Sequence, residues 1–206
     1  MRCEECGAEL PGVGQHRVPP PVRILTNRLL IRLAEANDVL ALLRYYHENI
    51  DHLAPTSPAL PPDFLTEAFW LRQMAKNQDD FARGRAVKLF LFDTSDVTAV
   101  VGQVSLNNIV RGAAYYCDLG YSLAENRQGQ GLMREALVRV IRYAFDDIGL
   151  HRVKAAYLPS NERSGRLLRG LGFVVEGYAR DYLLIEGRWQ DQILVGLTNP
   201  DWRAPD

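Results

Sequence analysis

The spacing of apolar residues changes several times along the chain, and each change marks an expected element of secondary structure. Apolar positions at helical spacing follow Asp38 and recur from Asp63 to about Arg83, which predicts two helices, with Asp63 as the N-cap of the second. Over 87–123 the pattern becomes that of strands, interrupted by a hairpin turn at 93–96. After a first short strand, the N-terminal half therefore predicts two helices and a meander of strands.

The C-terminal half continues with helices and strands in alternation. Its expected elements are a helix at 134–148, a strand at 153–158, a short helix from 162, and strands at 173–185 and 189–197 joined by Glu186-Gly187. No internal repeat interrupts this order. The pattern predicts an α/β (α+β) sandwich in which about four helices flank a mostly antiparallel central sheet of roughly six to seven strands.

Chain length and composition bound the number of domains. The chain has 206 residues, of which 47% are hydrophobic, and this is enough for one substantial core. Residues 1–22 contain Pro11 and the run Pro19-Pro20-Pro21 and lack apolar periodicity, so we expect a flexible N-terminal extension. Residues 23–206 are expected to form a single domain.

Charge and cysteine usage narrow the possible partners and the location. The net charge is −1, which does not favour nucleic acid or an anionic membrane surface as a partner. No apolar run approaches the roughly 18 residues that span a bilayer, and the N-terminus lacks a signal-peptide core. Three cysteines are too few for a disulfide framework. We therefore expect a cytoplasmic protein.

The segment 115–133 carries the most informative motif of the chain. An apolar run from Tyr115 to Leu123 is followed by Asn126-Arg127-Gln128-Gly129-Gln130-Gly131-Leu132-Met133, where a helix begins. Glycines let the backbone approach a ligand closely, and the free N–H groups of a first helical turn bind anions. Arg134 stands where a dinucleotide-binding turn needs a third glycine, and the Gly-Lys-Ser/Thr of a P-loop is absent. The segment predicts an anion-binding turn of another type.

A second motif follows the strand expected at 153–158. Asn161 precedes a short helix that contains Ser164 and ends in Leu171-Gly172-Phe173. Asparagine is a preferred N-cap, and glycine is the residue that most readily ends a helix in the left-handed conformation. We therefore predict that Asn161 caps this helix and that Gly172 terminates it.

Together these residues resemble the acetyl-CoA-dependent N-acetyltransferases of the GNAT superfamily. The resemblance rests on the turn 128–133, on the spacing Asn161-x-x-Ser164 and on Leu171-Gly172-Phe173, in that order along the chain. The run from Glu176 to Asp191 is similar to that of the bacterial ribosomal-protein alanine N-acetyltransferases of the RimJ type.

The resemblance covers roughly residues 22–203 and implies the GNAT fold, acetyl-CoA as co-substrate and no required metal. In this family the backbone amides of the turn hold the pyrophosphate of the cofactor. Asn126 is a mild departure, because the family usually has Gln or Arg at that position. The implied cofactor-binding residues are Leu119, Tyr121, Arg127, Gln128, Gly129, Gln130, Gly131, Leu132, Met133, Asn161 and Ser164.

The resemblance also implies catalytic roles. The superfamily often has a tyrosine acid at the position of Leu168, so we expect Ser164 to donate a hydrogen bond to the leaving sulfur instead. Asp118 is the candidate base, acting through water, since an α-amine with a pKa of ~7.7–8.0 needs little help to lose its proton. The expected substrate-binding residues are Tyr178, Asp181 and Tyr182.

Several functional alternatives stay open. The resemblance implies a monomer or homodimer that acts on a protein N-terminal alanine, belonging to a ribosomal protein. A small-molecule amine N-acetyltransferase and a catalytically idle acyl-CoA-binding module that docks on the ribosome are the rival functions. Cys3, Cys6 and His16 offer three zinc ligands where a structural site needs four, so a zinc-binding tail is a weaker alternative.

Overall fold

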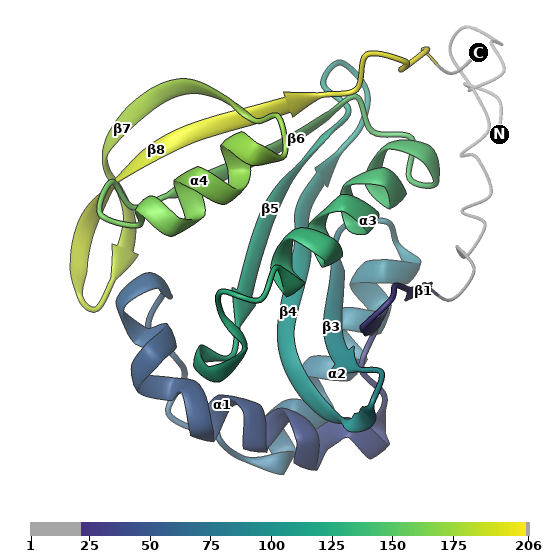
Figure 1. The fold of residues 1–206 in the computed structure, drawn as a ribbon, viewed down its shortest axis with the longest axis vertical. Helices are drawn as coiled ribbons and strands as arrows, with labels where there is room; N and C mark the ends of the chain where they lie inside the picture. The colour runs from purple at the N-terminus through teal and green to yellow at the C-terminus, as the bar shows by residue number, and fades with distance from the viewer. Residues whose placement is uncertain (1–21, 205–206) are drawn as a thin grey trace, which may run out of the picture.

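The computed structural model describes residues 22–204, and in that range eight strands form one mixed sheet with the order β1-β2-β3-β4-β5-β6-β8-β7 (Figure 1). The strands are β1 (Arg23–Leu25), β2 (Leu29–Arg32), β3 (Val87–Asp93), β4 (Asp96–Val110), β5 (Tyr116–Leu123), β6 (Arg152–Tyr157), β7 (Val174–Ile185) and β8 (Arg188–Thr198). The α-helices are α1 (Val39–Leu53), α2 (Glu67–Ala82), α3 (Leu132–Asp146) and α4 (Glu162–Gly170). Short 3-10 turns occupy Ala36–Asp38, Ala54–Thr56 and Glu125–Arg127.

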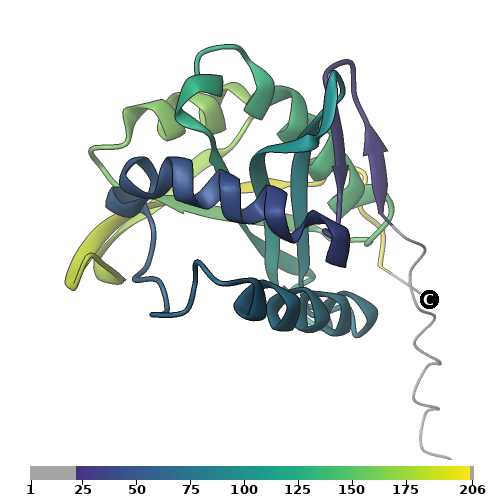
Figure 2. The same ribbon diagram turned by 90° about the horizontal axis from the view of Figure 1, so that it is seen from below.

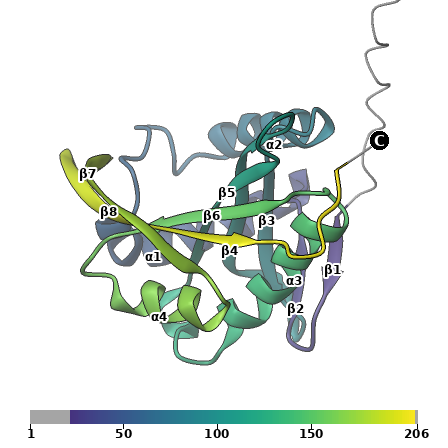
Figure 3. The same ribbon diagram turned by 90° about the horizontal axis from the view of Figure 1, so that it is seen from above.

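The helices cover both faces of the sheet, as Figure 2 shows, with α1 and α2 on one face and α3 and α4 on the other. Strands β1 and β7 lie at opposite edges (Figure 3). Neighbouring strands are antiparallel except β5 and β6, which are parallel and are connected through α3. A parallel pair needs such a crossover, because a tight hairpin can join only antiparallel strands. The predicted fold class is confirmed, with more strands than expected.

Each face of the sheet has its own apolar core. One cluster packs α3 and α4 against the sheet and includes the fully buried Leu137 and Leu168. The other packs α1 and α2 and includes an aromatic group in which Tyr46 stacks on Trp70 with ring centroids 4.9 Å apart. Two independent cores fix the positions of all four helices relative to the sheet, and therefore of the loops at their ends.

Strands β5 and β6 separate part-way along their length. They are paired only from Tyr116 and Arg152 to Leu119 and Ala155, although β5 continues to Leu123. On its other side β5 stays paired with β4 as far as Leu123. Within the described range, the edge of β5 over 120–123 that faces β6 therefore has no partner strand. Its backbone N–H and C=O groups are available to a ligand.

Two details of the chain differ from what the sequence predicts. The prediction of Asp63 as the N-cap of α2 is wrong: Thr66 is the N-cap, and its hydroxyl accepts the backbone N–H of Phe69 at 3.2 Å. Asp63 instead forms an ion pair with Arg72. The additional strand β1 arises because Arg23–Leu25 pairs with β2, which extends the sheet at its edge.

Other local predictions are confirmed. The side chain of Asn161 accepts the backbone N–H of Ser164 at 3.0 Å, as an N-cap does, and Gly172 has φ +92° beyond the end of α4. The extension 1–22 and its Cys3, Cys6 and His16 fall almost wholly outside the described residues, which begin at 22. Over 22–204, no helix is both long and apolar enough to traverse a bilayer.

Candidate functional site

The glycine turn before α3 exposes the first backbone N–H groups of that helix. Gly129 and Gly131 have φ +75° and +76°, in the left-handed region that glycine adopts without strain. Gly131 is the N-cap of α3 and provides no side-chain acceptor for the helical N–H groups. These groups and the positive end of the helix dipole are therefore free to bind an anion, as the sequence predicts.

The turn and the Asn161 motif line the same cavity, of about 550 Å³. We name it the motif cavity. It contains eight of the residues predicted to bind the cofactor, namely Tyr121, Gln128, Gly129, Gly131, Leu132, Met133, Asn161 and Ser164. The unpaired edge of β5 also contributes Ser122 and Leu123. An anion site, an open strand edge and apolar walls thus surround one elongated space.

Ser164 is held in the motif cavity by two polar contacts. Its backbone N–H is bound by Asn161, and its Oγ lies 2.6 Å from the Oη of Tyr121. Burial raises the pKa of Tyr121 to about 12, so this phenol stays protonated at neutral pH. When the Tyr121 hydroxyl donates to Ser164, the serine proton is free to point at a ligand. Leu168, where a tyrosine acid is common in the family that the motifs resemble, is instead fully buried in the core.

Helix α1 and the turn after it also reach the motif cavity. The side-chain amide of Gln128 donates to the imidazole of His52, with Nε2 atoms 2.6 Å apart. Leu53, Pro55 and Thr56 line the cavity beside His52. The sequence did not predict that His52 contacts Gln128 or that Leu53 and Thr56 line this cavity, because nothing in the local pattern of α1 links it to a turn 76 positions away.

A second cavity, of about 760 Å³, lies on the α1–α2 face of the sheet. We name it the aromatic cavity. Its walls include Tyr46, Phe64, Phe69, Trp70 and Phe90, and its polar lining includes Gln73, Asn77, Lys88, Gln103 and Glu186. Leu53 and Ser122 line both cavities, so the two spaces adjoin where β5 separates from β6. This second cavity was not predicted from the sequence.

The predicted base, Asp118, lies just before the point where β5 and β6 separate. Its carboxylate accepts from Nδ2 of Asn108 at 2.9 Å and forms an ion pair with Lys154 at 3.2 Å. Asp118 does not line either of the two larger cavities. Because side chains alternate along a strand, Asp118 is on the same face of the sheet as Ser122, which lines both.

The three predicted substrate-binding residues lie together on β7. The Oη of Tyr178 donates to Asp191 at 2.5 Å, and the backbone N–H of Asp181 donates to the other oxygen of Asp191 at 2.9 Å. Tyr182 is exposed on the same strand. None of the three lines either larger cavity, whereas Glu186 of the β7–β8 turn lines the aromatic cavity.

Three of the predicted cofactor residues do not line the motif cavity. Arg127 forms an ion pair with Asp93 at 2.9 Å, and the side chain of Gln130 donates to a backbone carbonyl within the same turn. Leu119 is buried in the core, at the last position where β5 pairs with β6. Arg134 and Arg163 line the cavity instead. Both adjoin the motifs, so a search for cations next to the glycine turn and Asn161 would have found them.

Comparison with known proteins agrees with this arrangement. A family model described as an acetyltransferase (GNAT) domain matches residues 28–174. The ribosomal protein uS5-alanine N-acetyltransferase of Escherichia coli (strain K12) is 42% identical over 183 residues, covering 89% of this chain and 94% of that protein.

Solved structures give the same result. The ribosomal-protein-S5-alanine acetyltransferase of Vibrio fischeri superposes with a TM-score of 0.85 at 34% identity, covering 89% of this chain and all of that one. Mycobacterium smegmatis RimJ in complex with CoA-disulfide gives a TM-score of 0.77 at 27% identity, covering 82% and 81%. With its fold, its glycine turn and these similarities, the chain belongs to the GNAT acetyltransferase family.

Proposed function

We propose that this protein transfers the acetyl group of acetyl-CoA to the N-terminal alanine of a ribosomal protein. The observation that carries the proposal is the junction of the two cavities at Leu53 and Ser122. A donor in the motif cavity and an acceptor in the aromatic cavity would meet there without a covalent intermediate on the protein. The 42% identity to the Escherichia coli enzyme over most of both chains supports the alanine acceptor. Such an enzyme would work in the cytoplasm.

The residues of the motif cavity fit acetyl-CoA. The free N–H groups after Gly129 and Gly131, with Arg134 and Arg163 nearby, suit its phosphates. The unpaired edge of β5 can bond the amides of the pantetheine arm as an added strand would. When bound, acetyl-CoA supplies the acetyl group as an activated thioester.

Ser164 and Tyr121 suit the departure of the thiol. As the acceptor nitrogen forms its bond to the acetyl carbon, the carbon–sulfur bond breaks and the sulfur gains negative charge. A hydroxyl of Ser164 that accepts from Tyr121 can donate its proton toward that sulfur. The chain from Tyr121 to Ser164 thus compensates for the leucine at position 168.

The acceptor amine needs only weak assistance to lose its proton. An α-amine with a pKa of ~7.7–8.0 is about a tenth neutral at pH 7, whereas a lysine amine needs far more help. Asp118, four residues before Ser122 and on the same face of β5, can take the proton through water. We assign to Asp181 on β7 the role of binding the incoming amine while the amine still carries its positive charge.

Replacing Asp118 by asparagine is expected to lower kcat/KM for an Ala-start peptide by about 10–100-fold at pH 7. The deficit should shrink as the pH rises to about 9, because the amine then loses its proton unaided. Initial rates of thiol release between pH 6 and 9 test this. Asp181→Asn serves as the comparison and should raise KM more than it lowers kcat. A deficit for Asp118→Asn that is constant with pH would contradict a role as base.

The acceptor class is tested by thiol release from acetyl-CoA with matched peptides. Ala-start peptides should be turned over at least about tenfold faster than peptides whose only amine is an internal lysine, because the α-amine is more often neutral. Mass spectrometry should place the added acetyl group on the α-nitrogen. Faster turnover of small amines would favour a metabolite acetyltransferase. CoA binding without turnover would favour an idle acyl-CoA-binding module.

A further inference from the structure

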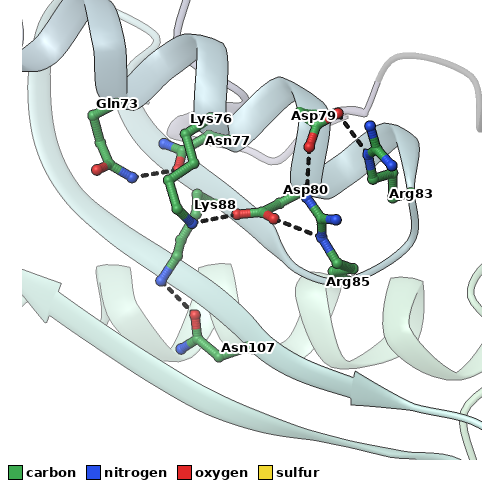
Figure 4. A network of polar contacts seen from close by, with 9 residues as sticks. All are labelled: Gln73, Lys76, Asn77, Asp79, Asp80, Arg83, Arg85, Lys88 and Asn107. Carbon is green, nitrogen blue, oxygen red and sulfur yellow. Dashed lines mark hydrogen bonds and ion pairs between the residues drawn. The ribbon is translucent and has the colours of Figure 1, made fainter.

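The aromatic cavity is lined by a lysine that forms no ion pair with any carboxylate of the described residues. Lys88 of β3 lines the cavity and donates a hydrogen bond to Oδ1 of Asn107, as Figure 4 shows. Among residues 22–204, no carboxylate lies within ion-pairing distance of its Nζ atom. Burial and the nearby ammonium group of Lys76 lower the pKa of Lys88, because both disfavour its charged form, while the negative charge of Asp80 acts in the opposite direction. The side chain keeps donor capacity for a further group, since an ammonium has three protons.

The acidic residue that lies nearest to Lys88 in this network is already neutralised. Asp80 accepts from Lys76 at 2.6 Å with one oxygen and from Nε of Arg85 at 2.9 Å with the other (Figure 4). These contacts lower the pKa of Asp80 and hold it ionised between two other cations. Among residues 22–204, Asp80 therefore compensates the charge of Lys88 only in part, and a ligand carboxylate would complete the pairing.

Two amide side chains, those of Asn77 and Gln103, line the aromatic cavity together with Lys88. Oδ1 of Asn77 accepts from the side chain of Gln73 at 2.8 Å, and Oε1 of Gln103 accepts from Oη of Tyr46 at 2.9 Å. Because both amide oxygens already accept hydrogen bonds, the NH₂ groups of Asn77 and Gln103 are left to donate to a ligand. An ammonium and two amide donors together favour an anion over a cation.

The distance from Lys88 to the junction of the two cavities determines how many residues can separate the acceptor amine from a group that binds Lys88. Lys88 pairs with Ser105 of β4, and Ser105 pairs with Gly120 of β5. Gly120 directly follows Leu119, the last residue of β5 that pairs with β6. Two strand spacings of roughly 4.8 Å place the backbone of Lys88 about 10 Å from Gly120, which lies two residues before Ser122 at the junction of the two cavities. An extended chain advances roughly 3.3 Å per residue. A carboxylate on the second or third residue of an acceptor would therefore reach Lys88.

We propose that Lys88 binds the side-chain carboxylate of an acidic residue at the second or third position of the acceptor peptide and thereby selects the protein that is acetylated. This inference rests on the proposed function and adds a sequence preference to it. Glu186, the carboxylate that lines the same cavity, is on the β7–β8 turn where Ile185 forms a bridge with Pro58. It contributes to the wall of the cavity from the β7–β8 turn, whereas Lys88 contributes from β3.

The experiment compares four Ala-start peptides that carry Glu or Gln at the second or the third position and are otherwise identical and neutral. We expect at least one Glu peptide to exceed its Gln counterpart in kcat/KM by about tenfold, mainly through KM, as a partly buried charge pair would. Lys88→Met keeps the apolar stem and should reduce this ratio to about one. Lys88→Arg should preserve the preference, because it keeps the charge.

Lys76→Met is the matched control. Lys76 belongs to the same network, is exposed and does not line the cavity, so the Glu preference should survive its loss. Equal use of Glu and Gln peptides by the unmodified protein would overturn the subsite and leave the proposed function intact. A Glu preference that survives in Lys88→Met would also overturn it. If small amines are acetylated and no Ala-start peptide is, the proposed acceptor is contradicted, and so is the subsite that depends on it.

Discussion

Replacing Ser164 by alanine is expected to lower kcat for acetyl transfer by roughly 100–1000-fold, the largest effect of any single change in the site. The substitution removes the hydroxyl that lies 2.6 Å from Tyr121 and that is placed to donate to the departing sulfur. The glycine turn is untouched, so KM for acetyl-CoA should change only a few-fold. Steady-state thiol release at saturating concentrations of both substrates measures the effect.

The Tyr121→Phe variant distinguishes the contribution of the phenol hydroxyl from that of the Ser164 hydroxyl. It leaves the Ser164 hydroxyl in place and removes its partner, so we expect a smaller loss of about tenfold in kcat. A loss as large as that of Ser164→Ala would mean that the phenol itself supplies the proton. Thermal unfolding of both variants controls for stability, since an unpaired hydroxyl that is partly buried costs roughly 1–3 kcal/mol. Full activity of Ser164→Ala would remove this residue from the mechanism.

Replacing Gly129 by aspartate is expected to raise KM for acetyl-CoA by roughly 30–100-fold and to change kcat little. The residue has φ +75°, and a Cβ atom at this position would meet nothing within 4 Å, so a side chain fits the space. Aspartate tolerates the left-handed conformation better than most residues. Its negative charge would face the position assigned to the phosphates and weaken their attraction to the N-terminus of α3.

Gly129→Asn is the control that isolates the charge. Asparagine has nearly the same shape and a similar conformational cost, so it should raise KM only a few-fold. The difference between the two variants should decrease at high salt, because the repulsion is screened. Equal KM values for the aspartate and asparagine variants would show that the phosphates do not bind at this turn.

Local chemistry explains which features could be predicted from the sequence. The glycine turn, the Asn161 cap and the Gly172 stop depend on backbone conformation and on hydrogen bonds between residues a few positions apart. The order of helices and strands follows from periodicity, which each segment carries by itself. The failure at Asp63 has a local reason as well, because Thr66 also belongs to the preferred N-cap residues and directly precedes the helix.

The partners of the charged site residues could not be predicted. Arg127 was expected to bind phosphate, yet the packing of its turn places it against Asp93 of β3. Asp118 was expected to act as a base, and the parallel pairing of β5 with β6 places it beside Lys154. An ion pair between distant segments depends on strand register, and no local pattern contains that register.

The sequence by itself determined the family-like motifs, the order of the elements and the anion-binding character of the turn, since each depends on neighbouring residues. Only the tertiary structure decided which motifs share a cavity. It brought Tyr121 to Ser164 and His52 to Gln128 and separated the ends of β5 and β6. Among the residues that the structure describes, it left Lys88 without an ion-paired carboxylate. These features arise from the packing of helices on two faces of one sheet, and that packing joins residues that are 43 or 76 positions apart along the chain.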